Sequence, residues 1–347
     1  RGPGATNAAA GVHIAKQDST PMILFVGQIG RAMKGREAFQ EVDYRQTFGD
    51  LAKWVEEIDD AARIPEVIAH AYHIAMSGRP GPVVLALPED MLRDEVDVPV
   101  CPYIEVAEPA PSLKAAARFE ELLRTAERPF IVAGGSRWTE QSVAQLKAFA
   151  HKHDIPVGCS FRRQQLFDHT DSHYAGDVGL GINPALKEQI EQSDCLILLG
   201  ARFSENPSQN FTLLGMPNPG KTLIHIHPGA EELGRIYTPT ISINATPECF
   251  FNAVDHIEAL PAGDRGKKAN EIYRAWTDAM PETPGDVQMG GVMTYLREAL
   301  SDDAIMCNGA GNYAIWLHRF WRFQRYGTQL APPSGSMGYG VPASVAG

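Results

Sequence analysis

The 347-residue sequence predicts an α/β fold built from parallel sheets. Short, continuous apolar runs that end at or near a glycine recur along the chain, as is typical of strands buried on both faces of a parallel sheet. Between them lie segments whose apolar residues have helical spacing. The composition is that of a globular protein, with 44% hydrophobic and 21% charged residues. This length accommodates two or three domains.

The first segment contains two predicted strands with a helix between them. Residues 21–27 (PMILFVG) and 82–87 (PVVLAL) are the apolar runs, and residues 64–76 carry one apolar helical stripe. Gly2-Pro3-Gly4 predicts a tight turn that leads into a helix from Ala5. Because the sequence has no initiator Met and starts inside this predicted turn, we expect an internal fragment of a longer protein.

A linker rich in proline and acidic residues, 96–111, precedes the second segment. Three apolar runs follow it, at residues 130–133, 195–199 and 222–227, and each leads into glycine and then a helical stretch. This pattern predicts a doubly wound sheet, in which ligands bind at the carboxyl ends of the strands. A full G-x-G-x-x-G fingerprint is missing, so nicotinamide binding is not supported.

The third segment follows loose regions around residues 261–268 and 281–286. It has a predicted helix at 287–300, a strand at 304–307 and an aromatic helix at 313–323. We therefore expect three doubly wound parallel-sheet domains, of which the first and the third are incomplete.

Charge and composition exclude several function classes. The net charge of −11 comes without a basic stripe, which argues against a nucleic-acid partner. No apolar run approaches the ~18–20 residues of a membrane span. The cysteines form no C-x-x-C pair, which argues against zinc and favours buried thiols in a reducing, cytoplasmic compartment. These cysteines are Cys101, Cys159, Cys195, Cys249 and Cys307.

The histidines give no clear metal signal in the sequence. His225 and His227 share one face of a predicted strand, but no third ligand is evident near them, so they are interpreted as core or loop residues. The remaining candidates are interpreted as surface residues; these are His151, His153, His169 and His173.

Five stretches match one family in order and spacing. They are RGPGATN (1–7), REAFQEVD (36–43), SGRPGPVVLALPED (77–90), LGARF (199–203) and GSMGYGVPA (335–343). The series resembles the thiamine diphosphate enzymes of the acetolactate synthase type, and the resemblance covers nearly the whole chain. It implies that residues 1–103 are the later part of a pyrimidine-binding domain, 108–262 a central domain, and 270–347 the start of a diphosphate-binding domain.

The resemblance also implies an activity. An enzyme of this type decarboxylates pyruvate and joins the resulting enamine to a second 2-keto acid, with thiamine diphosphate and Mg²⁺ as cofactors. Two alternatives stay open: a 2-keto acid decarboxylase of the same family, and, from another class, a non-catalytic nucleotide-binding subunit.

Positions in the motifs carry over residue by residue. Pro3 and Asn7 fall where the family lines its cofactor pocket. Phe39 and Gln40 match the catalytic pair that faces the thiazolium and the keto acid. Met337 matches the apolar wedge beneath the bent cofactor. Taken alone, GPGATN is no more than a turn and Met337 is more often a core residue.

The diphosphate-domain positions follow the same logic. The backbone of Gly335 and Met337 would bond the aminopyrimidine, and Gly311, Asn312 and Tyr313 would begin the diphosphate site. Acetolactate synthases commonly have Gln-His where this sequence has Asn312-Tyr313. Both pairs hydrogen-bond oxygen, so the role is compatible with the change.

Two further departures concern the flavin and the substrate. Gly200 and Arg202 match part of the FAD site of many acetolactate synthases, but Ser204-Glu205-Asn206 and His227-Pro228 replace residues that accompany it. The sequence therefore leans against FAD. Glu89 stands where the enzymes of branched-chain amino acid biosynthesis usually carry Lys near the active-site entrance. The acceptor keto acid is accordingly left open.

Two central parts of the family's site fall outside the sequence. The activating Glu would precede residue 1, and the metal motif would follow residue 347. We therefore expect no metal ligands within this chain, and an inactive chain by itself, since a general acid-base group is typically worth ~10²–10⁴ in rate. The family's active site lies between subunits, which implies a homodimer or homotetramer; a regulatory subunit is left open.

Overall fold

The computed structural model describes residues 1–347. Contacts divide the chain into two compact units, Arg1–Glu108 and Pro109–Gly347. The residues between them, 94–112, have no regular structure, as the linker prediction requires. The predicted boundary between a central and a third domain stays a prediction, because the contacts join both parts into the second unit.

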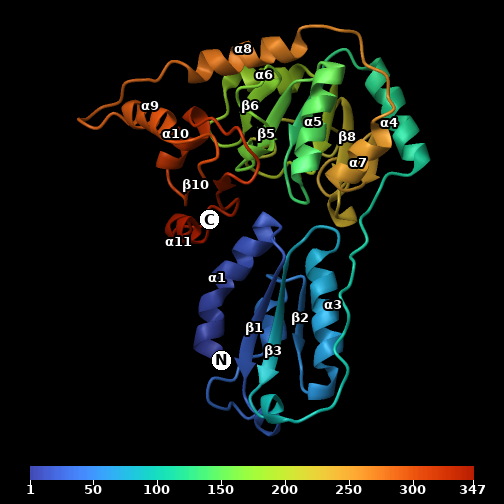
Figure 1. Ribbon diagram of the computed structural model, residues 1–347, viewed down its shortest axis with the longest axis vertical. Helices are drawn as coiled ribbons and strands as arrows, with labels where there is room; N and C mark the ends of the chain where they lie inside the picture. The colour runs from blue at the N-terminus through green and yellow to red at the C-terminus, as the bar shows by residue number, and fades with distance from the viewer. The chain divides into compact units, whose positions relative to one another are not determined.

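Unit 1 is a three-stranded parallel sheet of order β1-β3-β2 with helices on both faces (Figure 1). Its helices are α1 (Gly2–Asp18), α2 (Tyr44–Phe48) and α3 (Ile64–Met76), and its strands are β1 (Met22–Gln28), β2 (Trp54–Glu57) and β3 (Pro82–Pro88). The central strand β3 explains the two layers. Val83 and Leu85 pack with α3, whereas Val84 and Ala86 pack in the cluster that includes α1, because successive strand side chains point to opposite faces.

Unit 2 contains a six-stranded parallel sheet of order β6-β5-β4-β7-β8-β9. Its strands are β4 (Pro129–Ala133), β5 (Val157–Ser160), β6 (Tyr174–Val178), β7 (Cys195–Leu199), β8 (Thr222–His227) and β9 (Ile241–Asn244). The chain starts at β4, builds outward through β5 and β6, and then returns to place β7 on the other side of β4. The switch point where doubly wound sheets bind ligands therefore lies between β4 and β7.

Helices cover both faces of this sheet. One core contains apolar residues of α4, α5 and α7, and the opposite core contains residues of α6 and α8. The helices of unit 2 are α4 (Leu113–Thr125), α5 (Glu140–His153), α6 (Pro184–Gln192), α7 (Pro247–Val254), α8 (Arg265–Thr277), α9 (Met289–Ala299), α10 (Tyr313–Phe320) and α11 (Gly340–Ala346). None of the helices combines the length and the apolar character needed to cross a membrane.

The C-terminal part of unit 2 holds a third, two-stranded parallel sheet of β10 (Met306–Cys307) and β11 (Gln329–Leu330). Its small core contains Met293 of α9 and Leu317 and Phe320 of α10. All three sheets are parallel, so the predicted α/β fold class is confirmed.

Three local predictions were wrong. Gly2-Pro3-Gly4 is the first turn of α1 rather than a tight turn; proline is tolerated there because its missing N–H has no helical partner in any case. Helix α8 begins at Arg265, inside a region expected to be loose. Not all cysteines are buried: Cys159 and Cys195 are, but Cys101 is exposed.

Candidate functional site

A closed loop in unit 1, residues 35–41, carries the predicted catalytic pair. The carboxylate of Glu41 accepts hydrogen bonds from the N–H groups of Gly35 at 2.6 Å and Ala38 at 2.9 Å. These backbone bonds hold the pKa of Glu41 below its usual value. The loop is thus tied together by an ionised side chain at its base, and Phe39 and Gln40 occupy its tip.

The tip of this loop has a strained backbone and an exposed aromatic side chain. Gln40 has a left-handed backbone (φ 68°), which costs a residue with a Cβ about 1–2 kcal/mol. The Phe39 ring is 81% exposed, an unusual state for a large apolar side chain. Strain of this kind persists only where surrounding contacts enforce it, and it concentrates at functional sites.

The contact that holds the tip comes from the first motif. The N–H of Gly2 donates to the carbonyl of Gln40 at 3.2 Å. A Cβ at position 2 would lie 3.1 Å from that carbonyl oxygen and 3.2 Å from Cγ2 of Val42, so the approach favours glycine. The structure therefore brings the GPGATN and AFQE motifs together. Pro3 and Asn7 lie exposed on the first two turns of α1.

A cavity of about 330 Å³ adjoins this loop at the carboxyl ends of the unit 1 strands. Gln28, 5% exposed, donates from its amide to the Val42 carbonyl at 3.0 Å and to Glu57 at 3.2 Å. Lys34 pairs with Glu57 at 2.9 Å across the mouth. The sequence analysis did not predict that Gln28 and Glu57 line this cavity. Each is a polar residue at the carboxyl end of a strand, and this position was the signal that could have found them.

In unit 2, two glycine-rich loops meet backbone to backbone. A Cβ on Gly340 would lie 2.9 Å from the nitrogen of Gly309 and 3.2 Å from the carbonyl carbon of Asn308. The hydroxyl of Tyr313 accepts a hydrogen bond from the Gly309 N–H at 3.0 Å. The predicted diphosphate stretch and the GSMGYG stretch are therefore neighbours. Gly311 (φ 131°) and Asn312 lead directly into α10.

The Met337 side chain is presented by a turn that only glycine adopts easily. Gly335 (φ 68°) and Gly338 (φ 78°) both have left-handed backbones. Met337 between them is 85% exposed. This exposed position differs from the alternative interpretation of Met337 as a core residue.

Arg162, which the sequence did not single out, ties these loops to the central sheet. It is 4% exposed, and its guanidinium donates to the carbonyl of Gly309 at 3.1 Å and to that of Pro332. Asn308 donates to the same Gly309 carbonyl at 2.8 Å. Burial lowers the pKa of the adjacent His318 to about 3, so this imidazole stays neutral.

The switch point of the large sheet is closed by its own backbone. Gly200 (φ 70°) and Gly135 (φ 73°) pack so closely that a Cβ on either would collide with the other loop. The indole of Trp138 donates to the Gly134 carbonyl at 2.8 Å, and Gly200 donates to Ile226 at 2.8 Å. These backbone groups are therefore engaged within the fold, and a flavin at Gly200 and Arg202 stays a prediction.

The histidine prediction was wrong for three residues. His153, His169 and His173 are buried, whereas His151 is exposed as expected. Burial lowers the pKa of His153 to about 4 and that of His169 to about 3. His151 and His173 also gather around Asp171, a grouping that sequence spacing did not reveal.

Two family models match the chain. The thiamine pyrophosphate enzyme N-terminal TPP binding domain matches residues 1–47, and the thiamine pyrophosphate enzyme central domain matches residues 116–254. The first match covers the Gly2–Gln40 contact, and the second covers all six strands of the large sheet.

Curated relatives align along almost the full chain. The acetolactate synthase large subunit of Corynebacterium glutamicum is 29% identical over 99% of this chain and 56% of its own length. That of Lactococcus lactis is 28% identical, over 99% and 60%. The acetolactate synthase isozyme 1 large subunit of Escherichia coli is 26% identical, over 99% and 61%. The chain spans little more than half the length of these relatives. With both domain models matched in order, the chain belongs to the thiamine pyrophosphate enzyme family.

Proposed function

We propose that the protein carrying this chain is a thiamine diphosphate-dependent carboligase of the acetolactate synthase type. It decarboxylates pyruvate and joins the two-carbon unit to a second 2-keto acid. The observation that carries the proposal is the contact between Gly2 and Gln40, which places two family motifs side by side and holds Gln40 in a strained conformation. Similarity to acetolactate synthase large subunits along 99% of the chain supports the same conclusion.

The residues present fit thiamine diphosphate. Met337 and Phe39 are large apolar side chains displayed on fixed loops, as an apolar cofactor face requires. The glycines at 335 and 338 leave the backbone beside Met337 open to a close neighbour. When bound, thiamine diphosphate supplies a carbanion-stabilising centre. Asn312 and Tyr313 would hold its diphosphate end. The proposal includes Mg²⁺, but residues 1–347 contain none of its proposed ligands.

Each residue of the unit 1 loop has a defined task in this proposal. Gln40 orients the keto acid through its amide, which both donates and accepts hydrogen bonds. Phe39 shields the reacting carbon from water. Glu41 acts through its neighbours, because its two backbone bonds fix the loop on which Gln40 stands. Pro3 and Asn7, both exposed on α1, would line the cofactor pocket in this proposal.

A second candidate, a 2-keto acid decarboxylase, is favoured by Glu89. This carboxylate pairs with Arg1 at 2.8 Å, so the position is acidic and already partnered. A second anionic keto acid is attracted less strongly to such an entrance than to a lysine. In a decarboxylase a proton takes the place of the acceptor keto acid.

The proposed assembly is a homodimer or homotetramer, in which the unit 1 loop of one subunit and the Met337 loop of another serve one cofactor. A regulatory subunit is compatible with it. The flavin is not part of the proposal.

The test is to supply the purified full-length protein that carries this chain with thiamine diphosphate, Mg²⁺ and pyruvate and to follow acetolactate and CO₂ together. Acetolactate in step with CO₂ supports the carboligase. Free aldehyde with CO₂ moves the assignment to the decarboxylase. Failure to bind thiamine diphosphate would leave the non-catalytic subunit.

A matched pair of variants links the result to the site. Gln40→Ala should lower turnover at least about 10²-fold, the lower range for a positioned catalytic group. Gln46→Ala, an exposed glutamine on the neighbouring helix α2, should leave it unchanged. Equal activity of both variants would remove Gln40 from the proposal.

A further inference from the structure

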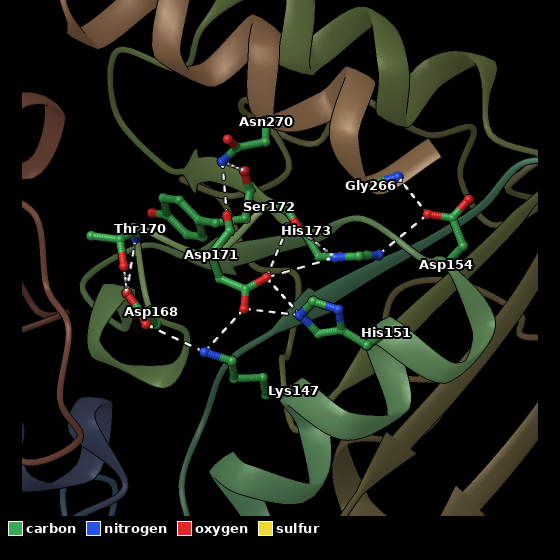
Figure 2. A network of polar contacts seen from close by, with 11 residues as sticks. Lys147, His151, Asp154, Asp168, Thr170, Asp171, Ser172, His173, Gly266 and Asn270 are labelled. Carbon is green, nitrogen blue, oxygen red and sulfur yellow. Dashed lines mark hydrogen bonds and ion pairs between the residues drawn. The ribbon is translucent and has the colours of Figure 1, made fainter. Parts of the chain in front are cut away.

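A second cluster of chemically active side chains lies in unit 2, where the end of α5 meets the loop before β6 (Figure 2). His151 stands in the last turn of α5, and Asp171 and His173 directly precede β6. One ligand atom from each of the three lies within 4.8 Å of the others. The sequence separates them by about twenty residues, and only the fold brings them together.

The spacing within the cluster is close to that of a metal site. Oδ1 of Asp171 lies 3.0 Å from Nε2 of His151 and 3.6 Å from Nδ1 of His173. Ligands at 2.0–2.2 Å from a tetrahedral zinc ion are about 3.3 Å apart. Two of the three edges therefore already have the required length to within a few tenths of an ångström.

Groups outside the cluster favour one tautomer of His173. Its buried Nε2 has no hydrogen-bond partner, and Oδ1 of Asp154 lies 3.2 Å away, so this carboxylate is the nearest acceptor for a proton on that nitrogen. The hydroxyl of Ser172 lies 3.1 Å from Nδ1 and can donate to it, so Nδ1 keeps its lone pair. A carboxylate behind a histidine is the arrangement that orients imidazole ligands in zinc sites.

Asp154 and Asp171 are themselves fixed by helix α8. The carboxylate of Asp154 accepts from the N–H groups of Arg265 at 3.0 Å and Gly266 at 3.0 Å, the first residues of that helix. The amide of Asn270, one turn later, donates to the Asp171 carbonyl at 2.9 Å. The cluster is therefore held rigid, which reduces the entropy lost when an ion binds.

The positive charge next to the Asp171 carboxylate comes from a lysine. Nζ of Lys147 lies 3.0 Å from Oδ2 of Asp171 and 3.4 Å from Oδ2 of Asp168. Its side chain is 46% exposed, so it can turn to solvent without a packing cost.

From this geometry we propose that His151, Asp171 and His173 bind a divalent transition metal ion, zinc in the first instance, with Asp154 as the residue that orients His173. Two imidazoles and one carboxylate are a zinc ligand set that leaves a fourth position for water. The ammonium of Lys147 competes with the ion for Asp171. The bound ion ties the end of α5 to the loop before β6, and through Asp154 to the start of α8.

The test uses purified protein stripped with a chelator and titrated with ZnSO₄ by calorimetry, with Co²⁺ absorption as a second readout. We expect one equivalent per chain, a higher unfolding temperature with zinc, and the visible bands of tetrahedral Co²⁺. His151→Ala is the first variant, because its side chain is 44% exposed and its loss should not unfold the protein. It should weaken zinc binding more than about 100-fold, and Asp154→Asn about 10- to 100-fold.

Two variants separate a metal site from an ordinary polar network. Lys147→Met should tighten zinc binding, whereas a purely structural ion pair would gain no affinity for zinc. His256→Ala is the matched control, an exposed histidine 3.7 Å from Glu120, and should bind zinc like the parent. Zinc binding that is absent from both the folded parent and Lys147→Met, or that survives His151→Ala and Asp171→Asn unchanged, overturns the proposal.

Discussion

Replacing Arg162 with Met should destabilise unit 2 and loosen both of its glycine-rich loops. The guanidinium makes two charge-assisted hydrogen bonds, to the carbonyls of Gly309 and Pro332, and such bonds contribute about 1.5–3 kcal/mol each. The carbonyls left behind lose a buried donor, while removing a buried cation recovers part of the loss. We therefore expect a net cost of about 2–4 kcal/mol.

The assay is thermal unfolding followed by circular dichroism, together with calorimetric titration of thiamine diphosphate. For a unit of this size each kcal/mol lowers the unfolding temperature by roughly 2–4 °C, so the expected decrease is about 5–15 °C. The affinity for thiamine diphosphate should fall as well, because the loops that carry Asn312 and Met337 both rest on this arginine. Arg162→Lys should recover little, since an ammonium lacks the planar fork that reaches two carbonyls.

Arg118→Met is the control. Arg118 is 45% exposed and pairs with Glu121 on the surface of α4, so its loss should cost no more than about 0.5 kcal/mol. If Arg162→Met unfolds at the same temperature as Arg118→Met, the arginine does not anchor the loops and the reasoning is refuted.

Three further changes probe the two units. Gly2→Ala should cost about 1 kcal/mol and lower turnover, because the new Cβ would crowd the Gln40 carbonyl at 3.1 Å; unfolding and pyruvate decarboxylation measure both effects. Met337→Ala should leave the unfolding temperature unchanged but weaken thiamine diphosphate binding about 10- to 30-fold in calorimetry, because the 85% exposed side chain has little protein packing to lose and, in the proposed site, would pack on the cofactor. Asp177→Asn should stabilise the protein by about 1–3 kcal/mol at pH 8 and by less at pH 5, measured by denaturant unfolding, since one oxygen of Asp177 is buried without a partner.

The sign of the Asp177 effect follows from linkage. Burial raises its pKa to about 8, above the unfolded value of about 3.9. The native state therefore binds more protons between these values, and its stability falls as the pH rises from about 4 to about 8. A pH-independent difference between the parent and Asp177→Asn contradicts this account. Gly2→Ala with full activity, or Met337→Ala with unchanged affinity, contradicts the other two.

Three of the strands that the sequence predicted are almost fully buried on both faces. Residues 82–87, 195–199 and 222–227 became β3, β7 and β8, because only an unbroken apolar run satisfies two helix layers at once. Strand β2 (Trp54–Glu57) was missed, since its four residues are all half-buried and end in two glutamates. Helix α8 was missed because its sequence is strongly polar; packing against β6 decides its structure.

The residues of the candidate site also differ in how far the sequence predicts them. Gly335, Met337 and the loop around Gln40 belong to short motifs of consecutive residues, which can be recognised in the sequence. Arg162 is not, since it reaches carbonyls 147 and 170 residues away in the chain. The same holds for the cluster around Asp171, in which each histidine seen alone resembles a surface residue. Spacing along a chain carries no information on contacts that depend on the packing of whole elements.

The Gln40 loop and the Met337 loop both contain left-handed backbone positions but fill them with different residues, and the difference carries a prediction. Beside Met337 the left-handed positions are glycines, whereas position 40 keeps a side chain despite the strain. Gln40→Gly would relieve about 1–2 kcal/mol of strain and cost about 0.5–1 kcal/mol of extra unfolded-state entropy. We therefore expect a slightly more stable protein.

The same change should remove activity, because the amide that orients the keto acid is lost. Glu37→Gly is the matched control: Glu37 is exposed in the same loop and also left-handed (φ 54°), so glycine there should give the same stability gain and keep full turnover. Thermal unfolding and pyruvate decarboxylation on both variants separate the two effects. If Gln40→Gly stays as active as Glu37→Gly, the strain at position 40 serves the loop alone and the side chain has no catalytic task. If activity is lost while stability rises, the protein tolerates the strain at position 40 for the sake of the glutamine amide.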